Sequence, residues 1–139
     1  MKKIFAATFL ILVCHSINFA QCDKKVVITS SKTEYLDADS SVQRSEDEYT
    51  TIEISKPSIT ITPGDHTMKG LIKSDLCNWK IPYIEGSSVM EITMNDDQGN
   101  ERKATMTIEG KNGKLTIWVK TEGMPIIIRV PIDKFEEKN

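Results

Sequence analysis

The sequence predicts an all-β fold, a single antiparallel up-and-down meander of about eight strands. Two observations favour it. Apolar and polar residues alternate along most of residues 26–133, and turn signals separate these segments at roughly eight- to twelve-residue intervals. No window in that range has the spacing of an amphipathic helix. Because closure removes unpaired edge strands, we expect a small barrel in preference to a two-sheet sandwich.

The chain opens with two lysines and an apolar run from Ile4 to Val13, the pattern of a secretory signal peptide whose core is too short to span a membrane. We expect cleavage after Ala20, which divides the chain into a signal (1–20) and one secreted or periplasmic domain (21–139) with no transmembrane segment. The mature chain would carry a net charge of about −4, which disfavours nucleic acid and anionic membranes as partners.

Two cysteines, Cys22 and Cys77, remain once the signal has been removed, in a compartment where disulfides persist. A bridge between them would tether the new N-terminus to the sheet. Two unpaired thiols are the alternative, because Cys77 lies on an apolar stripe where a small thiol can be buried. Lipid attachment at Cys22 is disfavoured, since Gln21 stands where such sites require a small residue.

The first strands are expected at KKVVITS and TEYL, and the charged segment DADSSVQRSEDE follows them as an exposed loop or hairpin tip. In that segment Asp37, Asp39, Ser41 and Glu48 fall at ligand positions of an EF-hand calcium loop. However, Val42 stands where that loop requires glycine, and the flanks have the pattern of strands. We therefore expect no metal site, with Asp37 and Asp39 bonded to local backbone amides.

TTIEISKPSITIT predicts a hairpin that turns at Pro57, which cannot donate a ladder hydrogen bond. This register places two pairs of isoleucines opposite each other: Ile52 with Ile61 and Ile54 with Ile59. The turn PGDH follows. Near residues 67–73, Gly70 marks a bulge or kink between Met68 and Ile72. CNWKIPY then puts four side chains on one face before a turn at Glu85-Gly86: Cys77, Trp79, Ile81 and Tyr83.

Three turns fix the register of the last four strands, expected near residues 88–95, 102–110, 114–120 and 126–133. Asn112-Gly113 suits a type I′ turn, in which both central residues have positive φ. NDDQGN suits a three-residue loop with Gly99 in the left-handed position, and Glu122-Gly123 suits a third turn. The resulting pairs share one apolar face: Ile108 with Ile117, Met106 with Val119, Ile92 with Ala104, and Val119 with Ile126.

Trp118 lies on the other face of that register, between Thr107 and Ile127, with Arg129 within diagonal reach. Tryptophan and arginine are enriched where proteins recognise partners, and an exposed ring can also stack on a sugar. Our leading hypothesis is a non-enzymatic binding module for an unknown protein or glycan, which acts through Trp118, Ile127 and Arg129. Alternatively, the C-terminal segment or the acidic loop covers the ring.

Four methionines, Met68, Met90, Met94 and Met106, point to the expected interior together with Trp79. Because methionine is adaptable, they could line an apolar pocket, and a carrier of a small apolar ligand is the alternative function. The same residues are common fillers of small cores, and so short a barrel has little spare volume. A purely structural envelope protein is the third hypothesis.

The mature chain has one histidine, His66, which stands in a turn beside Asp65. No nucleophile motif accompanies it, and too few soft ligands lie nearby in the sequence to hold zinc. We therefore expect no enzymatic activity, no catalytic residues, no metal and no other cofactor.

The signal peptide, the single small domain and the alternating meander over residues 26–133 together resemble small secreted bacterial lipocalin-like β-barrel proteins. No tryptophan precedes Trp79, so the glycine and tryptophan that lipocalins carry on their first strand have no counterpart here. The resemblance implies a barrel that binds a small apolar molecule.

Overall fold

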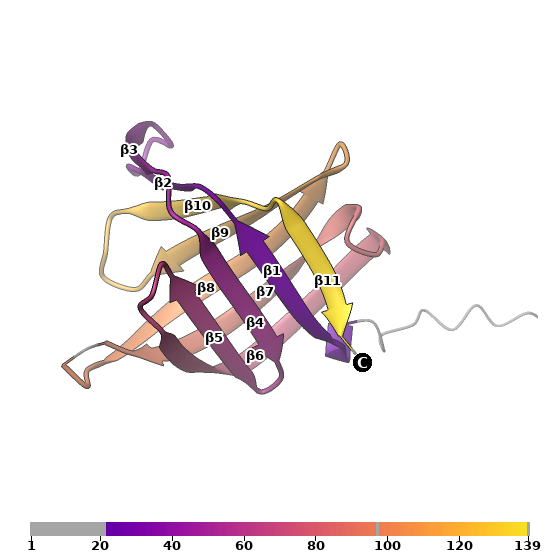
Figure 1. Ribbon diagram of the computed structural model, residues 1–139, viewed down its shortest axis with the longest axis horizontal. Helices are drawn as coiled ribbons and strands as arrows, with labels where there is room; N and C mark the ends of the chain where they lie inside the picture. Colours follow the sequence, from indigo (N-terminus) through magenta and orange to yellow (C-terminus); the bar gives the residue numbers. More distant parts are fainter. Residues whose placement is uncertain (1–21, 97, 139) are drawn as a thin grey trace, which may run out of the picture.

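The computed structural model describes residues 22–96 and 98–138, which form one antiparallel sheet of eleven strands (Figure 1). The all-β prediction is confirmed. In chain order the strands are β1 (Lys25–Ser30), β2 (Thr33–Leu36), β3 (Val42–Glu46), β4 (Thr50–Ser55), β5 (Ser58–Pro63), β6 (Met68–Ile81), β7 (Glu85–Asn95), β8 (Glu101–Lys111), β9 (Lys114–Thr121), β10 (Ile127–Pro131) and β11 (Lys134–Lys138). They pair in the order β11-β1-β4-β5-β6-β7-β8-β9-β10-β2-β3.

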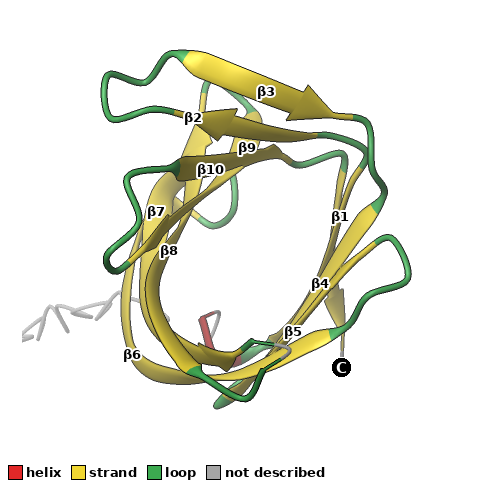
Figure 2. Cartoon of the chain, turned by 90° about the vertical axis from the view of Figure 1, so that its left-hand side faces the viewer, coloured by secondary structure: helices red, strands yellow, loops and turns green. Residues whose placement is uncertain are grey.

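The sheet curls far round on itself, but it is not closed into a barrel (Figure 2). Its ladder ends at β11 on one side and at β3 on the other, so the expected barrel is wrong, as is the two-sheet alternative. The physical reason is that the chain bends twice, once between β1 and β2 and once between β10 and β11. As a result, β1 lies between β11 and β4 in the sheet, whereas β10 lies between β9 and β2.

Hydrogen bonds hold the two bends against each other. Ser30 Oγ donates to the carbonyl of Pro131, and the backbone amide of Ser31 donates to the Asp133 carboxylate at 2.7 Å. The amide of Asp133 in turn donates to the carbonyl of Thr29 at 2.9 Å. The bends therefore redirect the pairing without leaving these backbone groups exposed to an apolar interior.

The strand count exceeds the expected eight partly because two strands lie in segments without apolar alternation. β3 lies in the charged segment after β2, and β11 is formed by KFEEK, which has a single apolar residue. In β11, Phe135 pairs with Ile28, so long-range pairing and one partly buried ring define the strand. Local sequence carries no signal of this kind.

The register of the C-terminal hairpins is confirmed at two of the three turns. Asn112 and Gly113 have φ of 53° and 73°, and Ile108 pairs with Ile117. Gly99 has φ of 80°, and Ile92 pairs with Ala104. The Glu122-Gly123 turn is longer than expected, so Val119 pairs with Ile128 rather than with Ile126. A shift of two residues leaves each side chain on its predicted face.

The proline at position 125 explains this longer turn. Pro125 has no amide to offer a ladder, so β10 begins only at Ile127, after a loop that includes Met124. Ile126, which was expected inside the sheet, is consequently 41% exposed.

The isoleucine pairs of the β4–β5 hairpin are confirmed, and its turn contains a cis peptide bond between Lys56 and Pro57. The two strands expected next are in fact one, β6, with bulges between Ile72 and Ser74 and between Trp79 and Ile81. No bulge occurs at Gly70. Instead the neighbouring strand approaches so closely that a Cβ there would lie 2.6 Å from the carbonyl oxygen of Thr93.

The turn that follows β6 is also displaced from its expected place. The amide of Ile84 donates to the carbonyl of Ile81 at 3.0 Å, and Glu85 and Gly86 already belong to β7. Since the second bulge of β6 precedes Ile81, that side chain leaves the face shared by Cys77 and Trp79 and is 44% exposed.

A hydrophobic core fills the middle of the curled sheet. It consists of aliphatic side chains and methionines from seven strands: Val26, Ile28, Ile52, Ile54, Ile59, Met90, Ile92, Ala104, Met106, Ile108, Ile117 and Val130. At the end where the β6–β7 turn lies, three aromatic rings pack against this core: Trp79, Tyr83 and Phe135. We call it the aromatic end. The opposite end holds the candidate site.

Candidate ligand-binding site

A cavity of about 410 Å³ opens at the end of the sheet opposite the aromatic rings, and we call this the cavity end. The loops between β5 and β6, β7 and β8, and β9 and β10 all lie at this end, on the left of Figure 1. Five core residues form part of its wall: Ile52, Ile92, Ala104, Met106 and Val130. The cavity is therefore a continuation of the core into space that side chains do not fill.

Small side chains at inward-facing positions create this space. Ala104 of β8 pairs with Ile92 of β7 on one side and with Thr121 of β9 on the other, and it lines the cavity. On β4, Thr50 occupies a corresponding place between Ser30 and Pro63. Alanine, threonine and serine do not reach across the curled sheet as the rings of the aromatic end do, so the interior stays hollow here.

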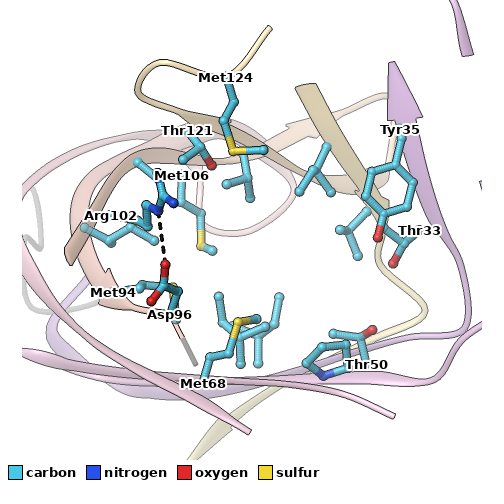
Figure 3. A pocket seen from close by; sticks show the side chains of 18 of the residues that line it. Thr33, Tyr35, Thr50, Met68, Met94, Asp96, Arg102, Met106, Thr121 and Met124 are labelled. Carbon is cyan, nitrogen blue, oxygen red and sulfur yellow. Dashed lines mark hydrogen bonds and ion pairs between the residues drawn. The ribbon is translucent and has the colours of Figure 1, made fainter. Parts of the chain in front are cut away.

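Methionines line much of the cavity, although the expected set is only partly correct. Met68, Met94 and Met106 line it, whereas Met90 is 1% exposed within the core and does not. Met124, in the loop between β9 and β10, joins them (Figure 3). Met124 is 53% exposed, and its position in an aperiodic loop gave the sequence no signal that it would line a cavity.

Trp79 lies at the aromatic end and takes no part in the cavity. β6 explains this, because Met68 begins the strand and Trp79 lies near its other end. The Trp79 and Tyr83 ring centroids are 5.1 Å apart, and those of Tyr83 and Phe135 are 4.1 Å apart. Trp79 Nε1 donates to Ser88 Oγ at 2.8 Å, and burial raises the pKa of Tyr83 to about 12.

The polar groups inside the cavity are hydroxyls. In Figure 3 Thr33 and Tyr35 lie next to each other on one side of the cavity, and Thr50 lies apart from them in the lower part of the view. Thr50 is 4% exposed, and its Oγ1 makes no hydrogen bond within the described part of the chain. A buried hydroxyl without a hydrogen bond lowers the free energy of unfolding by about 1–3 kcal/mol relative to a paired one.

The charged residues of the cavity lie at its mouth. Arg102 Nε is 3.4 Å from Asp96 Oδ2, and Asp96 Oδ1 accepts hydrogen bonds from the amides of Asn100 and Gln98 at 2.8 and 3.0 Å. These contacts, above all the amide of Asn100, hold the pKa of Asp96 below its usual value. Glu48, the third charged lining residue, lies close to Gly64 in the turn after β5.

The expected binding surface on the outer face is partly occupied by the protein itself. Trp118 pairs with Thr107 and Arg129 in the ladder, so Ile127 is its diagonal neighbour and not its direct one. The Arg129 guanidinium lies 5.6 Å from the centre of the indole and also donates to the carboxylate of Glu34. Arg129, which was expected to contact a partner, is therefore the cation that contacts the ring.

Glu34 is 8% exposed and lies between two cations. It accepts from Arg129 and lies 3.2 Å from Lys32 Nζ, and the hydrogen bond from Arg129 is the main reason that its pKa lies below the usual value. Ion pairs therefore link the charges of Lys32, Glu34 and Arg129 to one another on the outer face, beside the ring of Trp118.

The remaining sequence candidates have structural roles where the chain is described. Cys22 and Cys77 form a disulfide with Cα atoms 6.3 Å apart. Asp37 Oδ1 accepts from the amides of Asp39 and Ser41 at 3.0 and 2.9 Å, which shapes the β2–β3 turn. His66 is an exposed turn residue whose amide donates to the carbonyl of Pro63.

Residues 22–96 and 98–138 contain neither a cluster of metal ligands nor a membrane-spanning helix. No group of three or more His, Cys, Asp or Glu side chains is placed to hold a metal ion, and no helix has the length and hydrophobicity that a membrane crossing requires. The expected signal peptide and its cleavage after Ala20 lie outside the described residues, so secretion stays a prediction.

Comparison with models of known protein families, with curated proteins and with solved structures gives no significant match. The resemblance to lipocalin-like proteins therefore stays a prediction, and the function rests on the geometry of the cavity.

Proposed function

We propose that the protein is a non-enzymatic binding protein that holds one small apolar molecule in the cavity of the curled sheet. The observation that carries this proposal is the cavity of about 410 Å³, lined largely by aliphatic and methionine side chains. Pockets for small molecules have volumes of about 300–1,000 Å³ and the same kind of lining, with few polar groups. Methionine adapts its shape to different apolar partners, so the lining suits more than one ligand of this class.

The volume limits the size and affinity of the ligand. One water takes about 30 Å³ of liquid, so the cavity accommodates about 14 groups of that size. At about 0.5 kcal/mol for each non-hydrogen atom, such a ligand gains about 7 kcal/mol, which corresponds to a dissociation constant of about 10 µM. We therefore expect reversible binding, suited to a carrier or a scavenger.

A secreted or periplasmic location is the other part of the proposal. The disulfide between Cys22 and Cys77 supports it, because such bonds persist in oxidising compartments. The same bond opposes lipid attachment at Cys22, since the sulfur that a lipid would occupy is joined to Cys77. The mass of the mature protein with and without reductant tests both points: a loss of two hydrogens on oxidation supports the bridge, and an added lipid mass contradicts it.

The test of the cavity uses displacement of a neutral fluorescent probe, N-phenyl-1-naphthylamine. The variant Ala104→Phe projects a ring into the cavity and should abolish probe binding. Thr105→Phe is the matched control, because the next residue on β8 faces the opposite side of the sheet. We expect the control to bind the probe like the wild type. Retention of full binding by a folded Ala104→Phe protein would contradict the proposal.

A partner surface on the outer face is a second proposal, and one observation favours it. Leu76, Val89, Thr107 and Trp118 stand in one row across four neighbouring strands, and Leu76 is 69% exposed. A row with three apolar side chains on the outer face is typical of contact surfaces. It ranks second because Arg129, the charged member of the expected surface, is already bonded to Glu34. A complex recovered with the wild type and lost in Leu76→Lys would support it.

A further inference from the structure

We infer that Met124 is a site of reversible oxidation, and that its conversion to methionine sulfoxide weakens the binding of an apolar ligand in the cavity. The effect on binding rests on the proposed function and adds a means of regulating it. Met124 lines the cavity and is also 53% exposed to solvent. Its thioether is therefore accessible to a dissolved oxidant and belongs to the surface that contacts the ligand.

Exposure distinguishes Met124 from the other methionines in the described part of the chain. Met90 and Met106 are buried in the core, and Met68 and Met94 are partly buried. An oxidant must reach the sulfur before it can react, so the susceptibility of a methionine follows the exposure of its side chain. Met124 should therefore be oxidised first, while the other four keep their thioethers.

The loop between β9 and β10 holds Met124 beside the cavity through backbone hydrogen bonds. The amide of Met124 donates to the carbonyl of Thr121 at 3.1 Å, and the amide of Glu122 donates to the carbonyl of Lys103 at 2.8 Å. Between them, Gly123 adopts the positive φ of 77° that this turn requires. These contacts fix the backbone of the loop, so the oxidised side chain should stay beside the cavity.

Hydrogen peroxide is the oxidant, and the reaction transfers one oxygen atom to the Met124 sulfur. A lone pair of the sulfur attacks the peroxide, an S–O bond forms as the O–O bond breaks, and the other oxygen leaves as water. The sulfur is oxidised and the peroxide is reduced by the same electron pair. The product is a polar sulfoxide, which methionine sulfoxide reductases convert back to the thioether.

The sulfoxide should weaken binding because the lining around it is largely apolar. In Figure 3 the side chain of Met124 lies on the upper side of the cavity and that of Met68 on the lower side, so a ligand between them contacts both. A sulfoxide oxygen at this position either keeps its water, which takes space from the ligand, or loses that water to an apolar partner. A polar group that is desolvated without a hydrogen bond should weaken binding about 10-fold.

The experiment treats the mature protein with hydrogen peroxide until its intact mass shows the addition of a single oxygen atom per chain. Trypsin then releases residues 121–129 as one peptide, in which Met124 is the only methionine, so the mass of this peptide locates the oxygen. We expect the oxygen in this peptide and an affinity for N-phenyl-1-naphthylamine that is about 10-fold weaker. Treatment with both classes of methionine sulfoxide reductase, one for each epimer, should restore the affinity.

Two leucine variants assign the effect to one side chain. Met124→Leu keeps an apolar lining without sulfur, so it should bind the probe like the wild type and retain its affinity after peroxide. Met68→Leu is the matched control from the same lining, and it should lose affinity after peroxide as the wild type does. Oxygen found first on Met68 or Met94, or full affinity of a protein oxidised at Met124, would overturn the inference. Failure of the proposed function is distinct, since untreated wild type and Ala104→Phe would then behave alike towards the probe, whereas mass alone reports the site of oxidation.

Discussion

The two ends of the curled sheet share most of their strands but have opposite interiors. At the aromatic end Trp79, Tyr83 and Phe135 fill the space, and the hollow that remains beside Cys22 and Lys56 is only about 20 Å³. At the cavity end the space is about 410 Å³. The alternation of inward and outward residues is the same at both ends, so the size of the inward side chains decides which end is hollow.

Glycine makes the dense packing of the aromatic end possible. A Cβ at Gly110 would lie 2.7 Å from the carbonyl oxygen of Ile84 and 2.9 Å from the ring of Trp79. The backbone of β8 can approach the indole only because that position has no side chain. At the cavity end the corresponding inward position of β8 carries Ala104, whose small side chain lines the cavity.

The interactions that stabilise the aromatic end also differ from those that stabilise the cavity end. The aromatic end is held by the disulfide and by Lys56, which bonds both the carbonyl of Cys22 and the carboxylate of Asp75. The cavity end depends on β2, which carries Thr33 and Tyr35 into the cavity and is fixed from outside through Glu34. Stability should therefore depend mainly on the aromatic end and binding on the cavity end, and the following variants test that division.

The largest effect is expected from loss of the disulfide. The double variant Cys22→Ser with Cys77→Ser opens a loop that spans 55 residues. Loop-closure entropy gives a loss of about 4 kcal/mol in the free energy of unfolding. Urea denaturation measures it, and probe affinity of the folded fraction should be unchanged because the bond is far from the cavity. A loss below about 1 kcal/mol would mean that the aromatic end does not depend on the bond.

Truncation of the indole should have the next largest effect. Trp79→Ala removes the ring that packs on Tyr83 and bonds Ser88, and we expect a loss of about 3 kcal/mol. Met68→Ala, at the other end of β6, is the comparison. It enlarges a space that already exists, so its loss should be about 1 kcal/mol, while probe affinity changes. Equal losses in urea denaturation would show that the two ends are packed alike.

Much of this architecture could be predicted from the sequence, because turns and alternation act over short distances. Asn112-Gly113 determines its hairpin through backbone conformation alone, and Ile52 to Ile61 follow from one proline turn. The open sheet could not be predicted, because it depends on the meeting of bends near Ser31 and Asp133, residues far apart in the chain.

The candidate site could be predicted only in part, for a related reason. Alternation places Met68, Met94 and Met106 inside the sheet, yet it says nothing of the space between them. That space depends on which inward residues of distant strands face each other. Met124 shows the same limit, because it lines the cavity from a loop that has no alternation.

The outer support of the cavity end should depend on pH. Because the pKa of Glu34 is lower in the folded protein than its ordinary value of 4.5, its ion pair stabilises the fold above that value. This stability is lost as the pH falls through the lower, folded value. Glu34→Gln should lose about 2 kcal/mol at neutral pH, as for a hydrogen bond to a charged group. In urea denaturation at pH values of about 7 and 3, the gap between variant and wild type should shrink at the lower one. A gap that does not change with pH would exclude this role for the carboxylate.

The smallest effect is expected on the outer face, beyond both ends. Trp118→Ser removes a ring that contacts Arg129 but lies outside the core, so the loss should be at most about 1 kcal/mol, the value of an exposed cation–π contact. Probe affinity should be unchanged, because the strand that separates Trp118 from the cavity points Ile117 and Val119 inward and the indole outward. A loss of several kcal/mol would show instead that the ring belongs to the core, and weaker probe binding would show that outer face and cavity are coupled through β9.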